Sequence, residues 1–154
     1  MIVLGFDQAT KNTGFSVINN GKLKSHGVLS ADGSSIELIT NMFSLMRDKI
    51  DKTKPDLIIL EDAYYNNNAA VLKSLSLLKG MIWGYCIVND IKVTQYTPSS
   101  WRSKAGIEEG KGIKRSELKR SAVDFVKKNF NIECSDDEAE AIVISYIGYK
   151  EVNK

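Results

Sequence analysis

The sequence of 154 residues contains a single histidine, His26, and this scarcity removes several large enzyme classes. HEXXH zinc proteases need two histidines, and a lone histidine outside such motifs also gives no support to serine hydrolases with a histidine base, His/Cys zinc deaminases or histidine-based nucleases. Any catalysis must therefore rest on carboxylates, lysines or hydroxyl groups. The two cysteines, Cys86 and Cys134, form no metal-type pair, which favours a reducing compartment.

The sequence also lacks an apolar run approaching the roughly 20 residues that span a bilayer, and residues 1–20 show no signal-peptide pattern. We therefore expect a soluble, cytoplasmic protein with no membrane partner. The composition is 43% hydrophobic and 26% charged, which is typical of a globular chain. The length suits one domain, and we expect residues 1–154 to form it.

The small net charge of +2 conceals two segments of opposite sign. Residues 101–128 contain nine Lys or Arg and four acidic residues, a local charge of +5. Residues 133–140 contain five acidic residues and no base, a local charge of −5. A basic segment that runs into an acidic cluster is the first indication of function.

Hydrophobic periodicity predicts the order of elements along the chain. The predicted elements are three strands within residues 2–29, a helix over 34–52, a strand over 57–60, a helix over 66–88, a strand over 91–96, a short helix up to 104, and helices over 114–129 and 135–149. The order predicts an α/β fold with a mixed five-stranded sheet and helices on both faces. The helix from Asn66 to Val88 is apolar nearly all round, so its second surface suits a homodimer contact.

Two of the predicted buried strands end in an acidic residue. Asp7 follows IVLGF and Glu61 follows LIIL. Sites in open α/β sheets form outside the carboxyl ends of such strands. Either acid taken alone is more simply explained as the start of a surface loop.

The last predicted helix begins with SDDEAE, which places Asp137 and Glu140 on one face. That face continues as small and apolar residues, so both carboxylates should point toward the sheet. Part of the acidity has a structural explanation, because Ser135 and Glu138 fit a capping box and acids favour a helix N-terminus. This explanation does not cover Glu140.

Four carboxylates gathered at one place need cations. Two of them at ~4 Å repel by roughly 4 kcal/mol at an effective dielectric constant near 20. All-oxygen ligands favour Mg²⁺ or Mn²⁺ over zinc. Two such ions can clamp the attacking and leaving oxygens of a phosphodiester, and the neighbouring basic segment then suits the phosphates.

Three motifs together resemble the RuvC family of Holliday junction resolvases. GFDQATKNTGFSVI is similar to the opening of that family, LIILEDAYYNNN to its second motif, and SDDEAEAIVIS to its C-terminal helix. The resemblance covers essentially the whole chain with the same element order. The compact form and the acid-rich last motif look most like the phage-encoded members.

The resemblance implies an RNase H-like fold, a homodimer and a two-metal endonuclease using Mg²⁺ or Mn²⁺. The metal ligands carried over by position are Asp7, Glu61, Asp137 and Glu140. Two departures stand out: Glu140 replaces the aspartate usual in the family, and Gln8-Ala9 replaces the common Pro-Gly. The adjacent Asp136 is a spare acid that could replace or join Asp137.

Basic residues bracket the glycine-rich loop over 105–112. They are Arg102, Lys104, Lys111, Lys114, Arg115, Lys119 and Arg120. A solvated helix face is the alternative, but this many bases around a loop favour phosphate contacts. By analogy with the family, bases near Arg102 and near Lys114 or Arg115 should lie by the scissile phosphate and stabilise the charge of the transition state.

Two aromatic residues, Tyr64 and Tyr65, follow Glu61 closely. Tyr64 matches the aromatic position of the family. We interpret both as stacking on a base unpaired at the centre of a DNA junction, with packing under the next helix as the alternative.

The sequence thus predicts an endodeoxyribonuclease that resolves Holliday junctions and other branched DNA, nicking two strands symmetrically as a dimer. An RNA-processing nuclease of the YqgF type and a non-catalytic junction-binding protein remain alternatives. GFDQATKNTG also resembles the phosphate loop of sugar kinases, but 154 residues leave no room for the second lobe that would enclose ATP.

Overall fold

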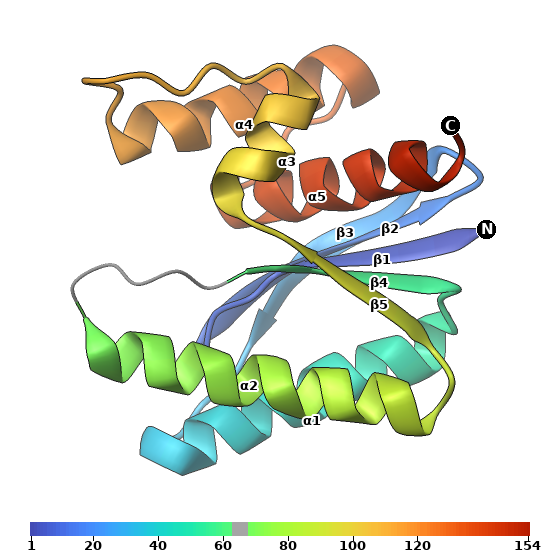
Figure 1. Cartoon of the computed structure of the whole chain (residues 1–154), viewed down its shortest axis with the longest axis vertical. Coiled ribbons are helices and arrows are strands. Elements are labelled where there is room, and N and C mark those ends of the chain that lie inside the picture. The colour runs from blue at the N-terminus through green and yellow to red at the C-terminus, as the bar shows by residue number, and fades with distance from the viewer. Residues whose placement is uncertain (63–67) are drawn as a thin grey trace.

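A five-stranded sheet forms the centre of the computed structural model, which describes residues 1–62 and 68–154 (Figure 1). The strands are β1 (Ile2–Asp7), β2 (Asn12–Asn19), β3 (Lys22–Ser30), β4 (Leu57–Glu61) and β5 (Lys92–Tyr96). The helices are α1 (Ser35–Thr53), α2 (Ala69–Val88), α3 (Pro98–Ala105), α4 (Arg115–Phe130) and α5 (Asp136–Val152). The predicted element order is confirmed, and the start proposed for α2 at Asn66 lies outside the described residues.

The sheet has the order β3-β2-β1-β4-β5 and is mixed, as predicted. β1, β2 and β3 form an antiparallel meander, whereas β4 pairs parallel with both β1 and β5. Phe6 of β1 stands opposite Leu60 of β4. The residues that follow them, Asp7 and Glu61, therefore leave the sheet side by side at one edge.

Alternate residues of the central strands pack into two separate hydrophobic layers, one on each face of the sheet. Val3 and Ile59 pack on the side of α5, whereas Leu4 and Ile58 pack on the side of α1 and α2, and all four are fully buried. This alternation follows from the two-residue period of a strand. Figure 1 shows α1 and α2 below the sheet and α3, α4 and α5 above it, so the expectation of helices on both faces is confirmed.

Helix α5 lies directly on the sheet, and its residues from Ala139 to Ser145 are all buried. Small residues permit this close approach, since a Cβ atom added to Gly148 would lie 1.5 Å from Ile59 Cδ1. The Ser16 hydroxyl on β2 also donates a hydrogen bond to the Ala141 carbonyl at 2.9 Å. These contacts fix the position of the helix that carries Asp137 and Glu140.

Helix α2 is longer and more apolar than expected from the prediction that no segment could span a membrane. By length and composition alone, it is the one helix in the described part of the chain that could cross a bilayer. One side of it nevertheless packs within the protein, because Leu78, Ile82 and Cys86 are fully buried with α1 and the sheet. Leu77 and Ile87 on its other sides are exposed.

Candidate active site

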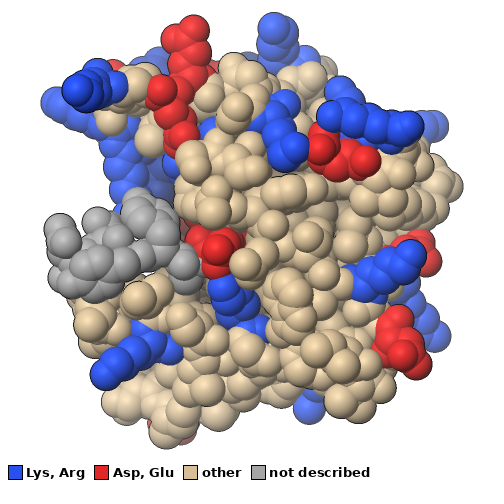
Figure 2. Space-filling model, in the orientation of Figure 1, with Lys and Arg blue, Asp and Glu red and all other residues tan. Residues whose placement is uncertain are grey.

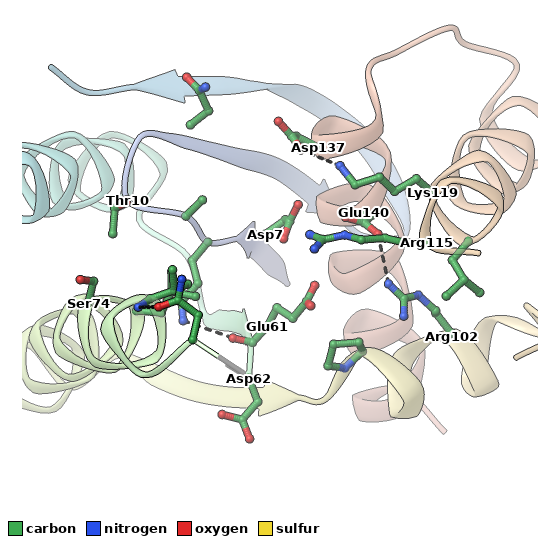
Figure 3. Close-up of a pocket in the computed structure, with 18 of the residues that line it drawn as sticks. Asp7, Thr10, Glu61, Asp62, Ser74, Arg102, Arg115, Lys119, Asp137 and Glu140 are labelled. Carbon is green, nitrogen blue, oxygen red and sulfur yellow. Dashed lines mark hydrogen bonds and ion pairs between the residues drawn. The ribbon is translucent and has the colours of Figure 1, made fainter. Parts of the chain in front are cut away.

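Five carboxylates line one cleft of about 810 Å³ (Figure 3). One of them, Asp62, is paired with Lys79, and the other four come from three elements. β1 and β4 supply Asp7 and Glu61, and α5 supplies Asp137 and Glu140. Figure 3 shows Asp7 between Glu61 on one side and the two α5 residues on the other. The structure therefore brings together the four acids that the sequence singled out.

A glycine on β2 allows the first turn of α5 to reach this cleft. Gly14 pairs with Asp7 in the β1–β2 ladder. A Cβ atom on Gly14 would lie 2.1 Å from the Asp137 carbonyl oxygen, so any larger residue would displace the helix. Gly14 lies within the opening motif, but no local pattern in the sequence signals its contact with α5.

The start of α5 is also held by its cap and by the single histidine. Ser135 and Glu138 form the predicted capping box, with Ser135 N–H donating to Glu138 Oε2 at 2.9 Å. Glu138 Oε1 lies 2.7 Å from Nδ1 of His26 on β3. The single histidine therefore ties the first turn of α5 to the sheet beside Asp137.

The crowded carboxyl groups bind protons more tightly than usual. Burial raises the pKa of Asp7 well above its ordinary value of 3.8, and Glu61, Glu140 and Asp137 raise it further. Burial and the Glu140 carboxylate raise the pKa of Glu61 to about 7, although Arg102 opposes this shift. Without a further positive charge, the cluster therefore retains protons close to neutral pH.

Two basic side chains partly neutralise the cluster. Arg102 Nη2 lies 3.3 Å from Glu140 Oε1. Lys119 Nζ lies 2.6 Å from Asp136 Oδ2 and 3.7 Å from Asp137 Oδ1. The hydrogen bond from Lys119 lowers the pKa of Asp136. Asp136 is not among the described residues that line the cleft. Asp137 rather than Asp136 is thus directed to the cleft.

The donor set fits a hard divalent cation, although the side chains are not yet gathered around one. No group of three His, Cys, Asp or Glu side chains within residues 1–62 and 68–154 stands ready to hold an ion. Glu61 Oε2 is buried without a hydrogen-bond partner in the same residues, and a cation would satisfy it.

The predicted phosphate-binding residues divide into two sets. Arg102, Arg115 and Lys119 line the cleft with the acids. Lys104 instead donates to Glu151 Oε2 at 2.7 Å, and Lys111 and Lys114 are exposed around the loop before α4. Figure 2 shows basic side chains, with acidic ones among them, at the upper left of the view, where the loop before α4 lies in Figure 1. Tyr64 and Tyr65 lie outside the described residues.

The raised pKa of Glu61 predicts how stability depends on pH. Between its ordinary pKa of 4.5 and the folded value of about 7, the folded protein holds a proton that the unfolded chain releases. The free energy of unfolding of the metal-free protein should therefore fall as pH rises through this window, by up to about 3 kcal/mol from Glu61. Urea unfolding in EDTA from pH 5 to pH 8 measures this dependence.

The matched comparison for this pH dependence is Glu61→Gln, which cannot titrate. Its stability should fall less steeply than that of the wild type over the same range. Equal slopes for the two proteins would contradict the assigned environment of Glu61.

Comparison with known proteins places the chain in a family. The family model described as crossover junction endodeoxyribonuclease RuvC matches residues 3–145. The RuvC protein of Bdellovibrio bacteriovorus is 27% identical, over 77% of this chain and 73% of its own. That of Dictyoglomus thermophilum is 27% identical over 98% of each chain.

Solved structures show the same fold at lower sequence identity. The structure of T. thermophilus RuvC in complex with Holliday junction substrate has a TM-score of 0.79 and 12% identity, covering 99% of this chain and 96% of that one. The Fowlpox virus resolvase with substrate Holliday junction DNA has a TM-score of 0.66 and 16% identity over the whole of both chains. The RNase H-like fold expected from the sequence is confirmed, and the chain belongs to the RuvC family of crossover junction endodeoxyribonucleases.

Proposed function

We propose that this protein is a structure-selective endodeoxyribonuclease that resolves Holliday junctions and other branched DNA in the cytoplasm. The observation that carries the proposal is the cleft in which four carboxylates converge beside Arg102, Arg115 and Lys119. Membership of the RuvC family supports the same function, as do similar folds solved with Holliday junction DNA.

The proposed metal ligands are the four acids of the cleft. Nucleases of the RuvC family depend on divalent metal ions in general, and we propose two Mg²⁺ or Mn²⁺ ions here. Such ions, when bound, would promote attack of water on a phosphodiester and stabilise the charge of the leaving oxygen. Asp7, Glu61, Asp137 and Glu140 would hold them, and the ionised forms of these residues would be favoured by the added positive charge.

The basic residues of the cleft would bind and orient the DNA backbone. Arg102 and Arg115 face the carboxylates (Figure 3), so they would contact the phosphate that is cut and offset the charge that develops there. Lys119, which lies beside Asp136 and Asp137 at the edge of the cleft, would bind a neighbouring phosphate. Lys104, Lys111 and Lys114 lie outside the cleft lining and would bind flanking phosphates. Tyr64 and Tyr65 follow the end of β4 and are proposed to stack on unpaired bases.

Helix α2 is proposed to join two copies into a homodimer. Gly80 and Gly84, one turn apart, have no described atom within 4 Å of the place that a Cβ atom would occupy. Each glycine lowers the stability of a helix by about 1 kcal/mol relative to alanine. Within the described part of one chain, no close contact at these two positions requires a glycine. The exposed Leu77 and Ile87 flank these glycines, so a second α2 could approach closely. Two clefts in one dimer would allow two symmetric nicks.

The dimer predicts different effects of large and small residues at Gly80 and Gly84. Leucine at either position should convert the dimer to monomers, because it separates the two helix backbones. Leucine suits the exposed face of a helix, so each monomer should still fold. Light scattering after size exclusion gives the mass. The control variants, Gly80→Ala and Gly84→Ala, should remain dimeric, and dimers of both leucine variants would contradict the interface.

The substrate is tested with a synthetic four-way junction, a linear duplex and a structured RNA of comparable length. With Mg²⁺ or Mn²⁺, we expect paired nicks in opposite strands of the junction and little cleavage of the duplex. Preferential cleavage of the RNA would favour an RNA-processing nuclease. Junction binding without cleavage under any divalent ion would favour a non-catalytic junction-binding protein.

A further inference from the structure

A glutamate of the loop before α4 binds the arginine that faces the acidic cluster. Arg102 Nη1 lies 2.9 Å from Oε1 of Glu109, while Nη2 of the same guanidinium lies 3.3 Å from Oε1 of Glu140. The Arg102 side chain is only 12% exposed. The two glutamates thus hold the charged end of the one arginine from opposite directions, one from the loop and one from α5.

The position of the Glu109 carboxylate is one that a phosphate group would suit. Both groups present two oxygens that can accept hydrogen bonds from the edge of a guanidinium. Burial lowers the pKa of Arg102, but the bonds and charges of Glu109 and Glu140 outweigh it, so the group stays charged. Glu140 belongs to the carboxylate cluster, which leaves Glu109 as the anion that substrate could replace.

The loop that carries Glu109 joins α3 to α4, and its residues from Glu108 to Lys114 are exposed. It lies between Gly106 and Gly112, whose φ angles of 72° and 93° permit backbone conformations that other residues rarely adopt. Ile107 is buried and anchors the start of the loop. The Glu109 side chain itself is 30% exposed, so water can take over its carboxylate when it departs.

We propose that Glu109 competes with DNA for Arg102. In the free protein its carboxylate occupies the guanidinium, and a phosphate of the bound DNA displaces it. Displacing Glu109 lowers the affinity for every DNA ligand. DNA that makes few other contacts with the protein should therefore bind weakly. This inference rests on the proposed function, because the phosphate that displaces Glu109 is taken to belong to the DNA backbone.

The neighbouring residue offers a matched control. Glu108→Gln removes the same charge from the same loop, and Glu108 is exposed. Junction affinity is measured by fluorescence anisotropy with Ca²⁺, on an Asp7→Asn background that prevents cleavage. We expect Glu109→Gln to bind the junction about threefold to tenfold more tightly than Glu108→Gln, in line with the loss of one modest charge-assisted hydrogen bond. Equal or weaker binding by Glu109→Gln would overturn the proposal, since a residue that merely orients Arg102 would weaken binding when removed.

A second measurement needs no DNA. Phenylglyoxal modifies accessible arginines, and mass spectrometry follows Arg102 separately from Arg115. Arg102 in the free protein should react several-fold faster in Glu109→Gln than in Glu108→Gln, and an unchanged rate would overturn the contact. If the wild type cleaves junctions but Glu109→Gln and Glu108→Gln bind them with equal affinity, this inference fails while the proposed function stands. Absence of junction binding and cleavage in the wild type and both variants would defeat the proposed function, and the inference with it.

Discussion

Replacing Asp7 with asparagine should stabilise the metal-free protein and reduce junction cleavage by about 10³-fold or more. The Asp7 carboxyl group is desolvated and repelled by Glu61, Glu140 and Asp137. Asparagine keeps the shape of the side chain and carries no charge, so the folded state no longer has to hold either the charge or the proton that neutralises it. For a domain of this size, each kcal/mol of repulsion removed raises Tm by about 2–4 °C.

The test measures Tm in EDTA at pH 8 together with cleavage in Mg²⁺. Asp124→Asn serves as the matched control, since Asp124 lies on an exposed part of α4 and should change neither quantity. Added Mg²⁺ should raise the Tm of the wild type more than that of Asp7→Asn. An Asp7→Asn protein that is less stable without metal and still cleaves would show that Asp7 is not part of the cluster described.

Replacing Gly14 with alanine should lower both stability and activity. The added Cβ atom would meet the Asp137 carbonyl oxygen at 2.1 Å and its carbon at 2.6 Å, and backbone atoms cannot rotate away as a side chain can. The first turn of α5 must shift, at a cost of about 3 kcal/mol. A displacement of Asp137 by about 1 Å is enough to reduce cleavage by roughly 10²-fold.

Gly110→Ala is the control for this effect, because its added Cβ atom would make only an ordinary contact of 3.7 Å with Ile113. Chemical unfolding and junction cleavage of both variants provide the comparison. A Gly14→Ala protein with wild-type stability and cleavage would mean that α5 does not depend on this approach for the position of Asp137.

The parts of the site that were predictable from the sequence depend on local patterns. Asp7 and Glu61 each end a run of apolar residues, and the alternation within such runs fixes the strand and its end. The spacing of Asp137 and Glu140 fixes their common helix face. The parallel pairing of β1 with β4 then needs only the element order, so the convergence of these acids was accessible before the structure.

The remaining features depend on contacts between distant parts of the chain. His26 meets Glu138 across 112 positions, and Arg102 meets Glu140 across 38. No periodicity or motif announces such pairs, because their partners are chosen by how α3 and α5 pack on the sheet. For the same reason, the sequence predicts Lys119 only as a phosphate contact, whereas in the structure it pairs closely with Asp136 and more loosely with Asp137.

The central claim, that four named carboxylates hold the divalent ions, is tested most directly by the crystal structure of the protein with Mn²⁺, using anomalous diffraction. We predict manganese in the cleft with Asp7, Glu61, Asp137 and Glu140 as its ligands, and Asp136 still paired with Lys119. Manganese bound through Asp136 in place of Asp137, or bound away from Asp7 and Glu61, would contradict the account.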